Sequence, residues 1–105
     1  MDVSKADWKL YRIRIGEWQE AYMEKLIQEY VQLLSKEEKA SDKFWKLEKR
    51  IKQDRRHPGV IIELNKENMI FDIVSLIKLG VITMENLDGF SAELKERVEF
   101  LLGRE

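Results

Sequence analysis

Residues 8–22 read WKLYRIRIGEWQEAY, and the large apolar side chains of this stretch recur at the spacing of a single helix face. At about 100° of rotation per residue they fall within one narrow stripe. The stripe consists of Trp8, Tyr11, Ile15, Trp18 and Tyr22. Because apolar residues continue at helical spacing to Leu34, the pattern predicts a long N-terminal helix over residues 4–34. A kink at Gly16 is an alternative to a straight helix, because glycine lowers the stability of a helix by about 1 kcal/mol relative to alanine.

The stripe has three interpretations: the core of the chain, a surface for self-association, or an anchor in a groove of another protein. About 30 residues of straight helix extend about 45 Å. A compact domain of 105 residues has a radius of gyration of only about 13 Å. The helix is therefore expected to project beyond its own domain. A second copy of the chain would cover the projecting aromatic side chains most simply, so we expect a twofold homodimer.

The rest of the chain predicts three more helices, over residues 41–56, 58–79 and 91–102, and a short helical turn over residues 83–87. Ser41 and Ser91 precede helical patterns and are candidates for N-cap residues. Gly80 suits the end of the third of the four helices. The expected fold is all-α: a single domain over residues 1–105, built as a small bundle of about four helices.

Two segments lead to more specific expectations. Residues 60–64 read VIIEL, which suits either a short strand or a helical turn. No second strand-like run is present in the sequence to pair with them, so a helix that starts near Pro58 is favoured. In the second helix, Phe44, Leu47 and Ile51 share one face. We expect this face to pack in the core.

The composition argues against an enzyme. The sequence has no cysteine and one histidine, which excludes disulfides, thiolate metal sites and cysteine nucleophiles. His57 lies beside the only proline, and the sequence has no nucleophile motif and no glycine-rich phosphate loop. Glu17, Glu20 and Glu24 share a helix face but lack the Glu-x-x-His pattern of di-iron bundles. We therefore expect no catalytic residue, no cofactor and no metal.

The sequence also gives no sign of a membrane segment. The apolar run over residues 69–79 contains Asp72 and Lys78 and is too short to cross a bilayer. Residues 1–5 lead into charged positions and do not resemble a signal peptide. We expect a soluble, cytoplasmic protein that does not associate with membranes.

The net charge of -1 hides an uneven distribution. Residues 36–57 contain nine Lys and Arg against five acids, whereas residues 58–105 contain five against nine. The basic segment defines a candidate patch made of Trp45, Lys46, Lys49, Lys52, Arg55 and Arg56. A tryptophan among cations suits nucleic-acid binding by stacking and phosphate contact. Packing of the patch against the acidic half of the same chain or of a dimer mate is the favoured interpretation, ahead of a protein partner.

Two functional hypotheses follow. The leading hypothesis is a non-enzymatic helical protein-interaction module, an adaptor, regulator or inhibitor, that works through its helix surfaces as a homodimer or with a protein partner. The alternative is a nucleic-acid-associated accessory protein that uses the basic helix around Trp45. Net charge -1 weighs against the alternative, because nucleic-acid modules are usually basic overall.

Overall fold

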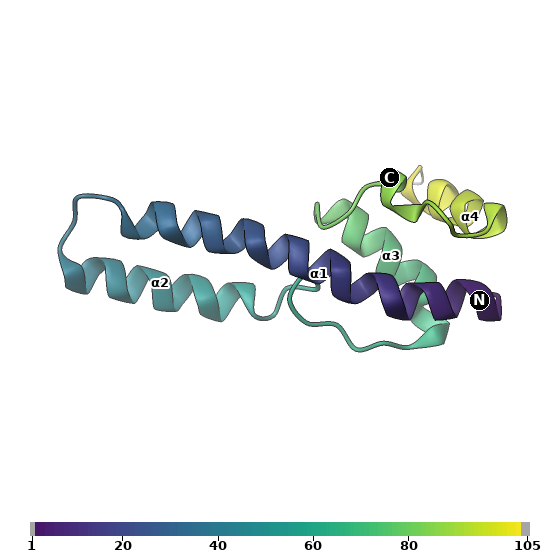
Figure 1. The fold of residues 1–105 in the computed structure, drawn as a ribbon, viewed down its shortest axis with the longest axis horizontal. Coiled ribbons are helices and arrows are strands. Elements are labelled where there is room, and N and C mark those ends of the chain that lie inside the picture. The colour runs from purple at the N-terminus through teal and green to yellow at the C-terminus, as the bar shows by residue number, and fades with distance from the viewer. Residues whose placement is uncertain (1, 104–105) are drawn as a thin grey trace. The chain divides into compact units, whose positions relative to one another are not determined.

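The computed structural model describes residues 2–103, and this part of the chain is all-α, with no strand (Figure 1). It contains four α-helices: α1 (Lys5–Leu34), α2 (Ala40–Asp54), α3 (Met69–Lys78) and α4 (Ala92–Leu102). Two short 3-10 helices, η1 (Lys66–Asn68) and η2 (Met84–Leu87), precede α3 and α4 respectively. The predicted fold class, with four helices and a long first helix, is confirmed, whereas the homodimer stays a prediction.

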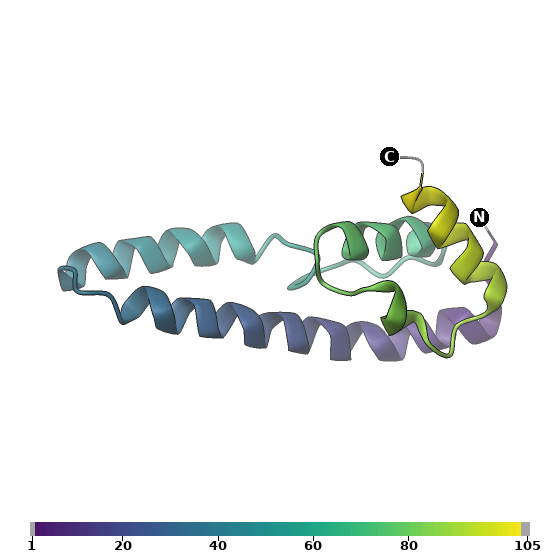
Figure 2. The same cartoon turned by 90° about the horizontal axis from the view of Figure 1, so that it is seen from above.

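The chain divides into two compact units, each described here by itself. The first unit contains the residues up to Trp18 together with those from Glu63 onward, and the second is Gln19–Ile62. Helix α1 is continuous through Gly16 and contributes residues to both units. We call the second unit the hairpin unit, because its part of α1 and the whole of α2 run antiparallel, joined by residues 35–39 (Figures 1 and 2). The expected single domain stays a prediction.

The first unit contains nearly all of the buried apolar side chains. Its α3 is apolar around most of its circumference and packs against α4. The indole of Trp18 lies 6.1 Å from the Phe90 ring, centroid to centroid, and 6.2 Å from that of Tyr11. The buried apolar side chains of this unit are Tyr11, Ile15, Trp18, Met69, Ile70, Ile73, Val74, Leu76, Ile82, Leu87, Phe90, Leu94 and Val98.

Local signals set the ends of the elements in the first unit. Gly80 follows α3 with a φ of +77°, the left-handed conformation that favours glycine, so its predicted role is confirmed. Thr83 and Asn86 form a reciprocal capping box at the start of η2. Ser91 is the N-cap of α4, as predicted, and its Oγ accepts a hydrogen bond from the amide of Leu94 at 3.2 Å.

Asp7 joins the start of α1 to the start of α4. Its buried carboxylate accepts hydrogen bonds from the Ser91 amide at 2.9 Å and from the Ser91 hydroxyl at 2.5 Å. The same hydroxyl caps α4 through Leu94, so one carboxylate orients the cap of a helix that lies more than 80 positions away in sequence. The contact therefore stabilises the long-range packing of the first unit.

The helix predicted over residues 58–79 is wrong in its first half. Residues 57–60 form a turn, residues 61–65 are neither helix nor strand, and regular helix begins with η1 and α3. The ring of Tyr22 packs on Gly59 so closely that an added Cβ would lie 2.3 Å from it, which holds this segment as a turn. Asn65 then caps η1 by accepting a hydrogen bond from the Glu67 amide. The helix consequently starts after this cap.

The predicted bounds of the second helix also need correction. Helix α2 begins at Ala40, with Lys39 in the N-cap position and no side-chain cap, so Ser41 lies inside the first turn and is not the cap. The amide of Lys43 bonds to the Lys39 carbonyl, which closes that first turn. The helix ends at Asp54, before the predicted residue 56, because the amide of His57 bonds to the Asp54 carbonyl in a turn.

Replacing the buried carboxylate tests the link between α1 and α4. Asp7→Ala is expected to lower the free energy of unfolding by about 2 kcal/mol, because the Ser91 amide and hydroxyl lose their charged acceptor. Urea denaturation followed by circular dichroism measures the change. Asp2→Ala is the matched control, since Asp2 is exposed, and it should leave the midpoint unchanged. Equal midpoints for the two variants would contradict the assigned role.

Candidate interaction surface

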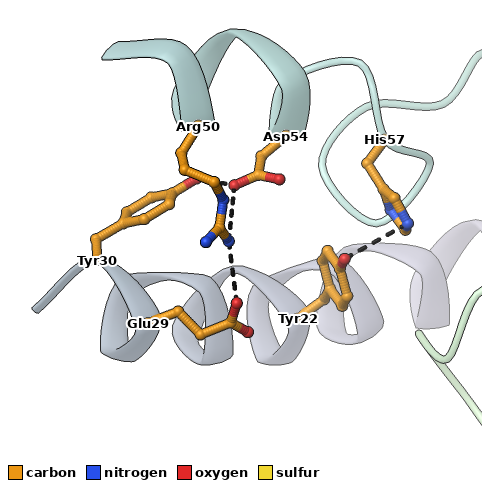
Figure 3. Close-up of polar contacts among 6 residues, drawn as sticks. All are labelled: Tyr22, Glu29, Tyr30, Arg50, Asp54 and His57. Atoms are coloured by element: carbon orange, nitrogen blue, oxygen red, sulfur yellow. Dashed lines mark hydrogen bonds and ion pairs between the residues drawn. The ribbon is translucent and has the colours of Figure 1, made fainter. Parts of the chain in front are cut away.

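A cluster of four polar side chains holds α2 against α1 in the hairpin unit (Figure 3). The Tyr30 hydroxyl donates a hydrogen bond to Asp54 Oδ2 at 2.6 Å. Arg50 Nη2 lies 3.0 Å from Glu29 Oε1 and 3.4 Å from Asp54 Oδ2. The guanidinium also lies 5.6 Å from the centroid of the Tyr30 ring. We call Glu29, Tyr30, Arg50 and Asp54 the polar seam.

The polar seam changes the ionisation of its members. Burial and the hydrogen bond to Asp54 raise the pKa of the Tyr30 phenol to about 12. The hydrogen bond to Glu29 raises the pKa of the Arg50 guanidinium, which is therefore a permanent cation. The phenol consequently stays a hydrogen-bond donor to the carboxylate throughout the neutral range.

A second set of contacts fixes the turn after α2. The imidazole of His57 stacks on the Tyr22 ring at 4.7 Å between centroids, with an angle of 11° between the planes. The Gly59 amide donates to His57 Nδ1 at 3.0 Å, so in the neutral ring the proton is on Nε2, which lies 3.4 Å from the Tyr22 hydroxyl. Gln19 donates to the Pro58 carbonyl at 3.0 Å. The only histidine therefore has a structural role in a turn.

The apolar stripe of α2 does not face the core, so that prediction is wrong. Within α2, all of whose residues the structure describes, no side chain is buried; Phe44 is 61% exposed and Ile51 is 43% exposed. The reason is the polar seam: Arg50 and Asp54 occupy the side of α2 that meets α1, and the stripe of Phe44, Leu47 and Ile51 lies beside that contact. Helix α2 is thus docked by its polar edge.

The apolar residues of α1 in this unit extend the same exposed surface. Ile27 is 56% exposed, and Val31 and Leu34 are exposed as well. Two adjoining grooves run between the helices and along α2; Ile51 and Arg55 line both, with Met23, Ile27 and Val60 in one groove and Phe44 and Leu47 in the other. We call this surface the hairpin face, defined by Met23, Ile27, Val31, Leu34, Phe44, Leu47 and Ile51.

The aromatic stripe expected from residues 8–22 lies inside the chain. Tyr11, Ile15 and Trp18 are buried, and Trp8 and Tyr22 are half-buried. Of the three interpretations that the sequence left open, the core is the one that this burial fits. The stripe leaves no continuous apolar surface for a second copy, and the exposed surface lies later on α1, on the hairpin face.

The predicted basic patch is split by ion pairs. Lys46 pairs with Glu38, and Lys52 lies 2.9 Å from Glu48. Trp45 is 63% exposed and meets Phe44 edge to face, at 4.9 Å between centroids. The remaining members, Lys49, Arg55 and Arg56, are exposed and form no ion pair with any described residue. Of these three, Arg55 lines the grooves of the hairpin face.

Residues 2–103 contain no group of three or more His, Cys, Asp or Glu side chains arranged to hold a metal ion. None of the helices in the described part of the chain is both long enough and apolar enough to span a membrane.

Removing Asp54 tests whether the polar seam holds the hairpin together. Asp54→Ala leaves both Tyr30 and Arg50 without their shared acceptor, so we expect a loss of local stability of about 1–2 kcal/mol. Hydrogen–deuterium exchange should show the amides of α2 exchanging about tenfold faster, because a loss of about 1.4 kcal/mol corresponds to a tenfold change in an equilibrium constant. Gln53→Ala is the neighbouring control, with an exposed side chain. Unchanged exchange in Asp54→Ala would refute the role of the seam.

The raised pKa of Tyr30 gives a prediction for alkaline solution. The folded pKa of about 12 lies above the ordinary value of 10.0, so the contribution of this phenol is complete below pH 10 and is lost as the pH rises toward 12. The unfolding free energy of the wild-type chain should therefore fall more steeply between pH 10 and pH 12 than that of Tyr30→Phe. Parallel pH profiles for the two chains would contradict this assignment.

The chain matches no protein-family model, no curated protein sequence and no solved structure. Its function is therefore inferred from its own residues and their arrangement.

Proposed function

We propose that the protein is a non-enzymatic interaction module, an adaptor, regulator or inhibitor, that binds its partners through the hairpin face. The observation that carries this proposal is the exposure of a two-helix apolar surface, to which α1 and α2 both contribute. Contiguous exposed apolar patches usually mark interaction sites. The cytoplasmic location and the homodimer expected from the sequence belong to this proposal and stay predictions.

The organisation of the hairpin unit supports this assignment. Leu26 is the only apolar side chain of Gln19–Ile62 that is buried. Two helices cannot bury an apolar stripe by themselves, and such stripes are normally closed by further helices. The polar seam holds α1 and α2 at a fixed spacing, so the grooves between and beside them are formed before a partner arrives. A preformed surface reduces the entropy lost on binding.

A second candidate function rests on Trp45. Its exposed indole shares the outer side of α2 with Lys49 and Lys52, and Arg56 follows the helix, which suits base stacking with phosphate contacts. The pairing of Lys52 with Glu48, and of Lys46 with Glu38, reduces the positive charge available to phosphate. Protein binding through the hairpin face is therefore the function that we favour.

A pair of isoleucines on α1 tests the favoured function. Ile27→Glu places a charge on the hairpin face, whereas Ile13→Glu changes an isoleucine of nearly the same exposure, 57% against 56%, in the first unit. We expect protein captured from native lysate by the wild-type chain, a second copy of the chain included, to be lost with Ile27→Glu and retained with Ile13→Glu, with and without nuclease. Equal capture by the two variants would argue against the hairpin face.

The nucleic-acid alternative predicts a different result. Labelled single-stranded and duplex probes would bind the wild-type chain at low salt, and binding would weaken with added salt and with Trp45→Ala or Lys49→Glu. We expect no shift of either probe. A salt-sensitive shift that depends on Trp45 and Lys49 but not on Ile27 would favour the alternative over the interaction module.

A further inference from the structure

We propose that the partner on the hairpin face is the same face of a second copy, related by a twofold axis that runs parallel to the helices. In this arrangement α1 of each copy lies against α2 of the other, and the four helices close into a bundle. The inference rests on the proposed function, because it names the occupant of the same surface. It also differs from the dimer first expected from residues 8–22, whose aromatic side chains are largely buried within the chain.

The contacts of the hairpin determine which residues lie at the same height. Leu34 lies beside Lys43, since the Lys43 ammonium bonds to the Leu34 carbonyl at 3.1 Å. Glu29 lies beside Arg50, and Tyr22 beside His57. Interpolation along the two antiparallel helices places three apolar pairs within about one helical turn of each other in height. These pairs are Leu34 with Phe44, Val31 with Leu47, and Ile27 with Ile51.

A twofold axis parallel to the helices preserves these heights. Each exposed apolar residue of α1 then meets the residue of the partner copy's α2 at its own level, so three apolar layers stack along the interface. The layers pair residues that are exposed or half-buried in the single chain. Such a surface is self-complementary, as an isologous interface requires. Four-helix bundles pack antiparallel neighbours in this way around a shared apolar core.

The charges at the edges of the hairpin face favour this arrangement. The outer edge of α1 has Glu24, one turn before Ile27. Arg55 is the C-cap residue that directly follows α2, one turn after Ile51. Interpolation places Glu24 and Arg55 at the same height. Both are exposed, and neither has an ion-pair partner within residues 2–103.

In the proposed dimer, Glu24 of each copy faces the partner copy's Arg55. Opposite charges beside an apolar helix seam set orientation and partner choice. The alternative twofold arrangement, with α1 against α1 and α2 against α2, cannot place Glu24 opposite Arg55, because one residue is on α1 and the other directly follows α2. The charge pattern therefore selects a second copy in one orientation.

Charge reversal at these two positions tests both the partner and the orientation. In Glu24→Arg homodimers, cations would face cations, and in Arg55→Glu homodimers, acids would face acids. Sedimentation equilibrium should show wild-type chains at twice 12.6 kDa and each single variant dissociating at least about tenfold more readily, the scale expected for two rim charge pairs. An equimolar mixture of the two variants restores both pairs and should associate like the wild-type chain.

The same-chain double variant Glu24→Arg with Arg55→Glu should also restore the dimer, which separates lost pairing from lost folding. Arg56→Glu is the neighbouring control, because Arg56 is an exposed cation that lines neither groove of the hairpin face. A wild-type chain that is still monomeric at about 1 mM would overturn the proposal, because even a weak specific dimer has a Kd below this concentration. Single variants that associate like the wild-type chain, or mixtures that fail to recover, would also overturn it.

The outcomes distinguish this inference from the proposed function. If the wild-type chain is monomeric, yet Ile27→Glu alone loses its captured protein, the second copy is refuted and the interaction module stands. If the wild-type chain is monomeric and the two isoleucine variants capture equally, both proposals fail. A wild-type dimer that is weakened by each single charge reversal and restored by mixing the two variants supports the second copy, whether or not any other protein is captured.

Discussion

The hydrogen bond from Tyr30 to Asp54, with Arg50 between Asp54 and Glu29, is the interaction on which the hairpin unit depends. It sets which side of α2 meets α1. Because that side is polar, the stripe of Phe44, Leu47 and Ile51 is left in solvent next to the exposed isoleucine, valine and leucine of α1. The hairpin face, the proposed function and the arrangement of the proposed dimer all follow from this one choice of docking side.

The two units are stabilised by different forces. The first unit has a core of buried apolar side chains from α1, α3, η2 and α4, and Asp7 connects the starts of α1 and α4. The hairpin unit has one buried apolar side chain, Leu26, and relies on hydrogen bonds and ion pairs of partly exposed groups. Such pairs contribute about 1 kcal/mol or less each. Burial of the hairpin face by a partner would therefore add a large share of the stability of this unit.

Much of the fold could be predicted from residue periodicity and capping chemistry. The stripe from Trp8 to Tyr22 predicts α1, and Gly80 and Ser91 mark real helix ends. The start of α3 was missed because it depends on contacts distant in sequence, above all the Tyr22 ring against Gly59. Periodicity also identified the apolar side of α2, but it could not show that Arg50 and Asp54 would turn this side away from α1. The sequence therefore indicates the apolar stripe of α2 but predicts, wrongly, that it packs in the core.

The central claim, that the polar seam leaves the hairpin face uncovered by its own chain, can be measured directly. A soluble paramagnetic agent relaxes exposed methyl groups, and Ile13 supplies a reference of known exposure. The Arg55→Glu chain in dilute solution represents the monomer, because this change is expected to weaken the dimer. There the Ile27 and Ile51 methyl groups should relax nearly as strongly as those of Ile13. In the wild-type chain the same methyl groups should become protected as the protein concentration rises. Weak relaxation of both methyl groups at every concentration, in both chains, would show that the chain covers this face itself and would contradict the account.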